Sequence, residues 1–185
     1  VYKRQLSDHK KFPERRFLVT EELPYYCGAE GNIRSYDTNN PWNIIAENDF
    51  IAGGFLWTGT DYIGEAGWPS HGWPAGLFDI CMVEKPRAAF HRAMWNDKPM
   101  VRIAVRDNAL DIDHGRDLWQ WPNMAAIWNF PRAYEGLVIE VNTTTNCERV
   151  ALFHNGNEMG VRRTADYPNH TITWYLPYRR GTLVA

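Results

Sequence analysis

The sequence predicts two structural classes in one chain, an α/β first half over residues 1–97 and an all-β second half over residues 98–185. In the first half, two short apolar runs are separated by a segment that begins like a helix. In the second half, apolar residues alternate at period two, which is typical of half-buried strands. The pattern changes near Lys98-Pro99, so we place the boundary between the two halves there.

Two apolar segments in the first half are expected to form buried parallel strands. Residues 17–20 run into Glu21-Glu22 and then Pro24, as a buried strand does where it enters a loop. Residues 49–58 are apolar on both faces and are followed by a loop rich in glycine and carboxylates. An apolar run of this kind is typical of a strand that is covered on both sides.

Helices are expected after each of these strands. Residues 41–47 begin with a proline in the first turn, and Asn40 precedes them as a candidate cap. Residues 85–95 place four apolar side chains at helical spacing, namely Ala89, Phe90, Ala93 and Met94. The order strand, helix, strand, helix predicts two βα units.

The second half is expected to be a sandwich of short strands. Around residue 140, Leu137, Ile139 and Val141 alternate with Val138, Glu140 and Asn142. Further strands are expected at residues 150–153 and 171–176. Asn155-Gly156 directly follows residues 151–154 and predicts a hairpin, because both central positions of such a turn favour positive φ. No element is predicted for residues 107–134.

Composition and charge limit the classes of partner. The chain has 185 residues, of which 44% are hydrophobic and 23% charged, so it can bury one or two modest cores. A formal net charge of -2 gives no broad attraction for phosphate backbones. The longest apolar run, residues 50–57, is far shorter than the roughly 20 residues of a membrane helix. We therefore expect neither a nucleic acid nor a membrane as partner.

The sequence offers no pattern for a metal or a cofactor. Cys27, Cys81 and Cys147 are odd in number and widely spaced, so they fit neither a disulfide framework nor a zinc motif, and we interpret them as isolated small hydrophobic residues. Residues 111–117 look like a cation loop. However, glycine is not sixth and Pro122 stands where a bidentate glutamate would be needed. We expect no metal and no cofactor.

Several segments resemble the family 2 glycoside hydrolases, in their β-galactosidase-like branch. Residues 50–65, FIAGGFLWTGTDYIGE, closely resemble the last barrel strand and following loop of that family. Residues 17–21 are similar to its seventh strand, and residues 76–79 and 85–87 to the stretch after the barrel. Residues 148–156 resemble the hairpin "VELFLNG" of the Ig-like domain that follows the barrel.

The resemblance implies a fold for each half. Residues 1–97 would be the C-terminal part of a (β/α)8 TIM barrel, comprising its last two βα units. Residues 98–185 would be an immunoglobulin-like β-sandwich, which we expect to be incomplete at its end.

The resemblance also implies an activity, the hydrolysis of β-linked sugars, in particular β-galactosides, by a retaining double displacement. Enzymes of this kind use two carboxyl groups. Glu21 is the implied nucleophile, because it follows Thr20 as the family's nucleophile follows Ser or Thr. Glu22 is the rival: strand alternation puts the two side chains on opposite faces, and the sequence does not fix which face meets the substrate. The family's acid/base glutamate belongs to an earlier strand, so we expect the chain alone to be inactive.

A carbohydrate is the expected partner, and six residues in or after the second strand are candidates for binding it: Trp57, Asp61, Glu65, Trp68, His71 and Trp73. The resemblance implies that Trp57 is a platform for a sugar ring, although a core tryptophan is the alternative. The two carboxylates can accept hydrogen bonds from sugar hydroxyls, or they can merely cap turns. The other three residues are interpreted as a pocket rim.

A non-catalytic carbohydrate-binding or accessory β-sandwich module is the alternative function, in which the nine tryptophans stack on sugars without cleaving them. A carboxylate at the end of a buried parallel strand favours the hydrolase instead. A barrel reduced to two strands would expose apolar edges, so we also expect self-association. A targeting signal, if the parent protein has one, is expected upstream of Val1.

Overall fold

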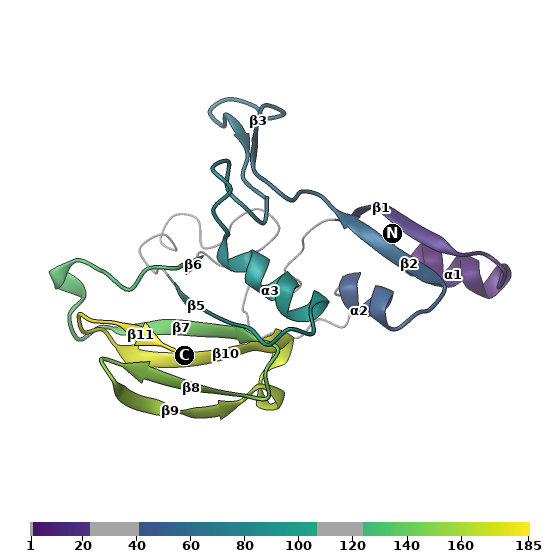
Figure 1. The fold of residues 1–185 in the computed structure, drawn as a ribbon. Coiled ribbons are helices and arrows are strands. Elements are labelled where there is room, and N and C mark those ends of the chain that lie inside the picture. Colours follow the sequence, from purple (N-terminus) through teal and green to yellow (C-terminus); the bar gives the residue numbers. More distant parts are fainter. Residues whose placement is uncertain (1, 23–40, 107–123) are drawn as a thin grey trace.

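The computed structural model describes residues 2–22, 41–106 and 124–185, and in these ranges strands outnumber helices (Figure 1). The helices are α1 (Tyr2–Lys11), α2 (Pro41–Ala46) and α3 (Pro86–Trp95), with short 3-10 turns at Arg132–Tyr134, Thr164–Asp166 and Pro168–His170. The strands are β1 (Phe17–Glu22), β2 (Ile51–Leu56), β3 (Tyr62–Ile63), β4 (Gly72–Trp73), β5 (Val101–Arg106), β6 (Met124–Ala125), β7 (Val138–Thr145), β8 (Arg149–His154), β9 (Asn157–Arg163), β10 (Thr171–Pro177) and β11 (Leu183–Val184). Within the described ranges, none of the helices has the length and apolar character needed to cross a membrane.

Strands β1 and β2 form a parallel pair, as the two apolar runs predicted. Phe17 pairs with Ile51 and Glu22 with Leu56, and the register shifts between these two points. A small core of Val19, Ile45 and Ile51 joins the pair to α2. The predicted order of strand, helix and parallel strand is therefore confirmed.

Helix α1 was not predicted from the sequence. Its ten residues are mostly polar, so they give no apolar stripe from which a helix could be inferred. The helix is tied to the parallel strands by His9, whose ring stacks on Phe50 with centroids 3.6 Å apart. A contact with a residue 41 positions away in sequence leaves no local signal.

A long connection leads from β2 to α3 and carries the β3–β4 hairpin, which projects away from the rest of the molecule (Figure 1). Tyr62 pairs with Trp73 in this hairpin. The Trp57–Thr58 and Trp68–Pro69 peptide bonds are cis. Helix α3 then begins at Pro86 and buries Ala89, Phe90 and Ala93, which confirms the helical spacing seen in the sequence.

The second half consists of two antiparallel sheets, as predicted, with strand orders β10-β7-β5-β6 and β11-β8-β9. They pack against each other over one apolar core, formed by Val105, Ile139, Val141, Val150, Leu152, Ile172, Trp174, Leu176 and Tyr178. The predicted hairpin joins β8 to β9, with φ of 51° at Asn155 and 79° at Gly156. Strand β6 lies in the region to which no element was assigned.

The predicted alternation along β7 is only partly right. Ile139 and Val141 are buried as expected, but Leu137 is exposed and Asn142 is fully buried. The cause is that α3 packs on β5 and β7, so this sheet is covered on a second face. Asn142 is accommodated there because its Oδ1 accepts a hydrogen bond of 3.0 Å from the Thr173 hydroxyl.

Two of the three cysteines lie in the described ranges, and both are free thiols. Cys147 is partly buried, but Cys81 is exposed, so its interpretation as a small hydrophobic residue is wrong. Its backbone N–H donates to the Asp79 carboxylate in a tight turn, which holds the thiol at the surface. Cys27 and the loop at residues 111–117 fall outside the described residues.

Candidate active site

Strand β1 ends in two carboxylates that differ sharply in environment. Glu22 is only 7% exposed, and its Oε2 occupies the space that a Cβ on Gly54 would need, beside Ile45 and Val19. It therefore points toward the side of the parallel pair that α2 covers. Glu21 is exposed. Side chains of successive strand residues point to opposite faces, so Glu21 is directed away from α2.

Burial changes the acidity of Glu22. Removal of the carboxyl group from water disfavours its charged form and raises the pKa of Glu22 from 4.5 to about 7. A carboxyl group that is buried against Gly54 and is largely neutral below that pH is suited to packing rather than to attack on a substrate.

Trp57 lies at the same end of the parallel pair as Glu21. Its backbone N–H donates a hydrogen bond of 2.6 Å to the carbonyl oxygen of Glu22, which extends the β1–β2 pairing to the carboxyl ends of both strands. The indole is 41% exposed. It meets the Tyr62 ring edge to face, with centroids 6.0 Å apart. One aromatic surface is thus available beside the strand ends, as stacking on a sugar ring requires.

Tyr62 connects these strand ends to the hairpin. Its hydroxyl donates a hydrogen bond of 2.5 Å to Glu65. This bond, followed by desolvation and by the charge of Glu65, raises the pKa of Tyr62, and the charge of Glu21 adds to the effect. The phenol therefore stays protonated. The ring contact with Trp57 and the hydrogen bond to Glu65 place Tyr62 between the strand ends and the hairpin. Tyr62 was not predicted from the sequence, although its place between Trp57 and Glu65 was the signal that could have identified it.

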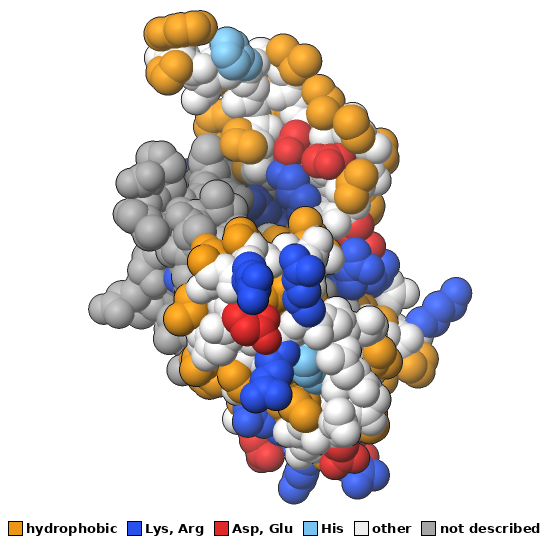
Figure 2. Space-filling model, turned by 90° about the vertical axis from the view of Figure 1, so that its left-hand side faces the viewer, with side chains coloured by type: hydrophobic (Ala, Val, Ile, Leu, Met, Phe, Trp, Pro, Cys, Tyr) orange, Lys and Arg blue, Asp and Glu red, His pale blue; other side chains and the backbone are white. Residues whose placement is uncertain are grey.

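The hairpin encloses a pocket of about 570 Å³. Four of the predicted substrate-binding residues line it: Asp61, Glu65, His71 and Trp73. Trp68 is 86% exposed and stands at the pocket edge, its ring 5.5 Å from that of His71. Figure 2 shows hydrophobic side chains gathered over this projecting segment, with acidic and basic side chains where it joins the rest of the molecule. The structure thus brings the predicted residues together in two adjoining places, the strand ends and the hairpin pocket.

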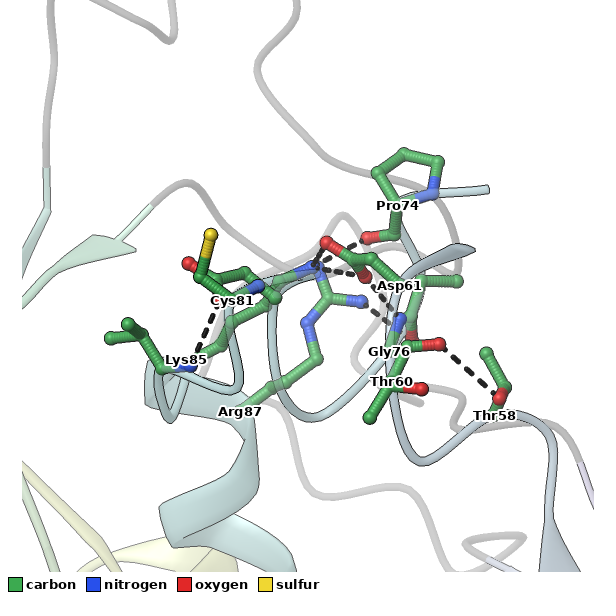
Figure 3. A network of polar contacts seen from close by, with 11 residues as sticks. Thr58, Thr60, Asp61, Pro74, Gly76, Cys81, Lys85 and Arg87 are labelled. Carbon is green, nitrogen blue, oxygen red and sulfur yellow. Dashed lines mark hydrogen bonds and ion pairs between the residues drawn. The ribbon is translucent and has the colours of Figure 1, made fainter. Parts of the chain in front are cut away.

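Asp61 has a second, structural task at the base of the hairpin (Figure 3). Its carboxylate lies 2.6 Å from the Lys85 ammonium and accepts a hydrogen bond of 2.8 Å from the Gly76 backbone. Lys85 also donates to the carbonyl of Pro74 at 2.9 Å, and Arg87 donates to that of Ala75 at 3.3 Å. Both ends of the loop are therefore held by one polar network, which fits the alternative that this carboxylate braces a turn.

Another hollow, of about 640 Å³, contains none of the predicted site residues. Its lining combines Trp42 and Asn43 of α2 and Met94 of α3 with residues of the β7–β8 turn and of the segment between β9 and β10. Among the described residues, no three His, Cys, Asp or Glu side chains are grouped so that they could hold a metal ion. The residues at the strand ends and in the hairpin pocket are therefore the candidate active site.

The sequence is similar to one family model and to two glycosidases of known sequence. A family model described as "Domain of unknown function (DUF4982)" matches residues 136–185. Over 150 residues, 78% of this chain, the sequence is 31% identical to a putative beta-glucuronidase of Formosa agariphila. Over 143 residues, 76% of the chain, it is 28% identical to the beta-galactosidase BoGH2A of Bacteroides ovatus. The chain spans 12% of the length of the first protein and 14% of the second.

Solved structures agree with these relatives. A glycosyl hydrolase family 2 member from Bacteroides cellulosilyticus is 28% identical and superposes with a TM-score of 0.78, over 98% of this chain and 24% of that chain. A β-glucuronidase of Bacteroides uniformis shares the fold at 17% identity and a TM-score of 0.58, over 99% of this chain and 23% of that chain. In sequence and in fold, the chain belongs with the family 2 glycoside hydrolases.

Proposed function

We propose that this chain carries the catalytic nucleophile, Glu21, of a retaining family 2 glycoside hydrolase that cleaves β-galactosides. The observation that supports this most directly is the separation of the two carboxylates at the end of β1. Glu22 is buried against Gly54 with a raised pKa, whereas Glu21 is exposed on the opposite face. Only Glu21 is accessible to a sugar.

The proposed architecture assigns each half of the chain a place in the enzyme. Residues 1–97 would supply the last two βα units of a (β/α)8 barrel, and residues 98–185 an immunoglobulin-like sandwich beside it. The alternation of α1, β1, α2, β2 and α3 supports the first assignment, and the two facing antiparallel sheets support the second. The exposed side chains of Leu18 and Phe55 on the parallel pair are consistent with a face that further strands would cover.

In the proposed reaction, Glu21 attacks the anomeric carbon while a second carboxylic acid protonates the oxygen of the departing group. The C–O bond to the leaving group breaks, and a covalent glycosyl–enzyme ester forms on Glu21. Water, deprotonated by the same second carboxylate, then displaces Glu21, and the sugar leaves with its original anomeric configuration. The second carboxylate is assigned to a part of the enzyme other than this chain, so we expect the isolated chain to be inactive.

The substrate is proposed to rest on Trp57 and to extend into the hairpin pocket. The exposed indole offers its face to the C–H face of the sugar in the cleavage position. Glu65, His71 and Trp73 line the adjoining pocket, where carboxylate and ring nitrogen can bond hydroxyls. Asp61 and Trp68 complete the predicted set, the first by bracing the loop and the second as an exposed ring at the edge.

Kinetics of the full-length gene product that contains this chain test the proposal. Hydrolysis of an aryl β-galactoside should lose at least about 10³-fold in kcat in Glu21→Gln, because the covalent route is then closed. Glu22→Gln should stay within about tenfold of the unsubstituted protein. Nuclear magnetic resonance of the first product should show the β-anomer. If a folded protein binds galactosides, glucosides and mannosides but hydrolyses none of them, the carbohydrate-binding module is the correct function.

A further inference from the structure

The hairpin pocket has an acidic lining. Among the described residues, three carboxylates and no lysine or arginine line it: Asp61, Glu65 and Asp79. The nearest cations are Lys85, which is paired with Asp61 at 2.6 Å, and Arg87, which is buried and donates to the Ala75 carbonyl. Both cations thus have partners of their own, and neither lines the pocket.

Glu65 is the carboxylate placed to meet a substrate. Asp61 is held by the Lys85 network, and Asp79 accepts two backbone N–H groups, those of Cys81 and Val83, at 2.8 Å each. Glu65 is exposed, and its described partner is the Tyr62 hydroxyl. Because the Tyr62 ring contacts Trp57, a sugar resting on that indole lies about one side chain away from the Glu65 charge.

Building on the function proposed above, we infer that the hairpin pocket prefers uncharged sugars to uronates, with Glu65 as the residue that sets this preference. A neutral sugar presents hydroxyl groups that can donate hydrogen bonds to a carboxylate. A uronate presents an acceptor-only group of like charge, and no described cation in the pocket compensates it. A like charge a few Å away near a protein surface lowers binding on the order of tenfold.

Matched substrates in the full-length gene product test the inference. We would measure kcat/KM for aryl β-galactoside against aryl β-galacturonide, and for aryl β-glucoside against aryl β-glucuronide, since each pair differs only at C6. The neutral member should be preferred on the order of tenfold or more. Glu65→Gln keeps the shape of the side chain and removes its charge, so it should shift the ratio toward the uronate by about the same factor. Glu158→Gln, an exposed glutamate on β9, is the matched control and should leave the ratio unchanged.

The outcomes distinguish failure of the charge preference from failure of the proposed hydrolase function. Equal or better hydrolysis of the uronates, or a ratio that Glu65→Gln does not move, overturns the charge preference while the hydrolase stands. If nothing is hydrolysed, the hydrolase proposal fails, and calorimetric binding of the corresponding methyl glycosides then decides the charge preference independently. The charge preference is supported if the neutral glycosides bind more tightly than the uronates and Glu65→Gln reduces that difference in affinity. Equal binding of the two would overturn it.

Discussion

The carboxylate of Asp61 lies 2.6 Å from the ammonium group of Lys85, although the two residues are 24 positions apart in the chain. Their side chains are only 18% and 20% exposed, respectively. Burial lowers the pKa of Lys85, and the hydrogen bond to Asp61 opposes that effect. The pair closes the loop that carries the β3–β4 hairpin, so the shape of the candidate site depends on it (Figure 3).

The strength of this closure can be measured with a double-mutant cycle of Asp61→Asn and Lys85→Met. Each single change should cost about 2 to 3 kcal/mol in the free energy of unfolding, because it leaves a half-buried charge without its partner. The coupling energy should be about 1 to 3 kcal/mol by urea unfolding. The Glu84–Arg92 pair is the control: Arg92 is 44% exposed, so its coupling should stay at or below about 1 kcal/mol. Equal coupling in the two pairs would contradict the bracing role of Asp61.

Close packing at the base of the loop that carries the β3–β4 hairpin predicts that adding one methyl group there lowers stability. A Cβ on Gly76 would collide with backbone atoms of Thr60 and Asp61, which cannot move without opening the loop. Gly76→Ala should therefore destabilise the protein by at least about 2 kcal/mol. Gly59→Ala is the matched control, since nothing lies within 4 Å of its added Cβ, and it should change stability by less than about 0.5 kcal/mol. Similar thermal unfolding midpoints for the two variants would count against the loop geometry described.

Glu22 predicts an unusual pH dependence of stability. Its pKa is raised from 4.5 to about 7 in the folded protein, so the folded state binds more protons than the unfolded state between these values. The contribution of Glu22 is fully present below pH 4.5 and is lost as pH rises through 7. After allowance for partial solvent screening, we expect a loss on the order of 2 kcal/mol.

Urea unfolding at several pH values checks this. Glu22→Gln should flatten the stability curve between pH 4.5 and 7, because the neutral side chain no longer titrates. Glu21→Gln should keep the slope, since Glu21 is exposed. If both variants retain the pH dependence of the unfolding free energy, a group other than Glu22 is its source.

The elements that the sequence predicted correctly are those with local signals. A few neighbouring residues suffice to predict each of them: the apolar runs of β1 and β2, the prolines that open α2 and α3, and the Asn155-Gly156 turn. Helix α1 has no such signal, because its segment is mostly polar and the stacking of His9 on Phe50 joins residues far apart in the chain. The burial of Asn142 likewise depends on α3 covering the sheet, which no alternation pattern records.

The candidate site shows the same division. Glu21 and Trp57 could be named because the segments that hold them resemble strands of the family 2 glycoside hydrolases, and Glu65 because it lies in the loop after the second of these strands. The face of the strand on which each glutamate lies could not be predicted from the sequence. It depends on a register shift in β1 and on the space that Gly54 leaves for Glu22. The link from Asp61 to Lys85 is equally invisible, because it joins the two ends of a long loop.

The central claim, that Glu21 is the nucleophile of a retaining glycosidase, is tested most directly by mechanism-based labelling of the full-length gene product. A 2-deoxy-2-fluoro-β-galactoside with a good leaving group should form a stable glycosyl ester, and peptide mass spectrometry should locate it on Glu21. The label should be lost in Glu21→Gln and retained in Glu22→Gln. A label on Glu22, or no label on a folded protein with galacto, gluco and manno reagents alike, would contradict the account.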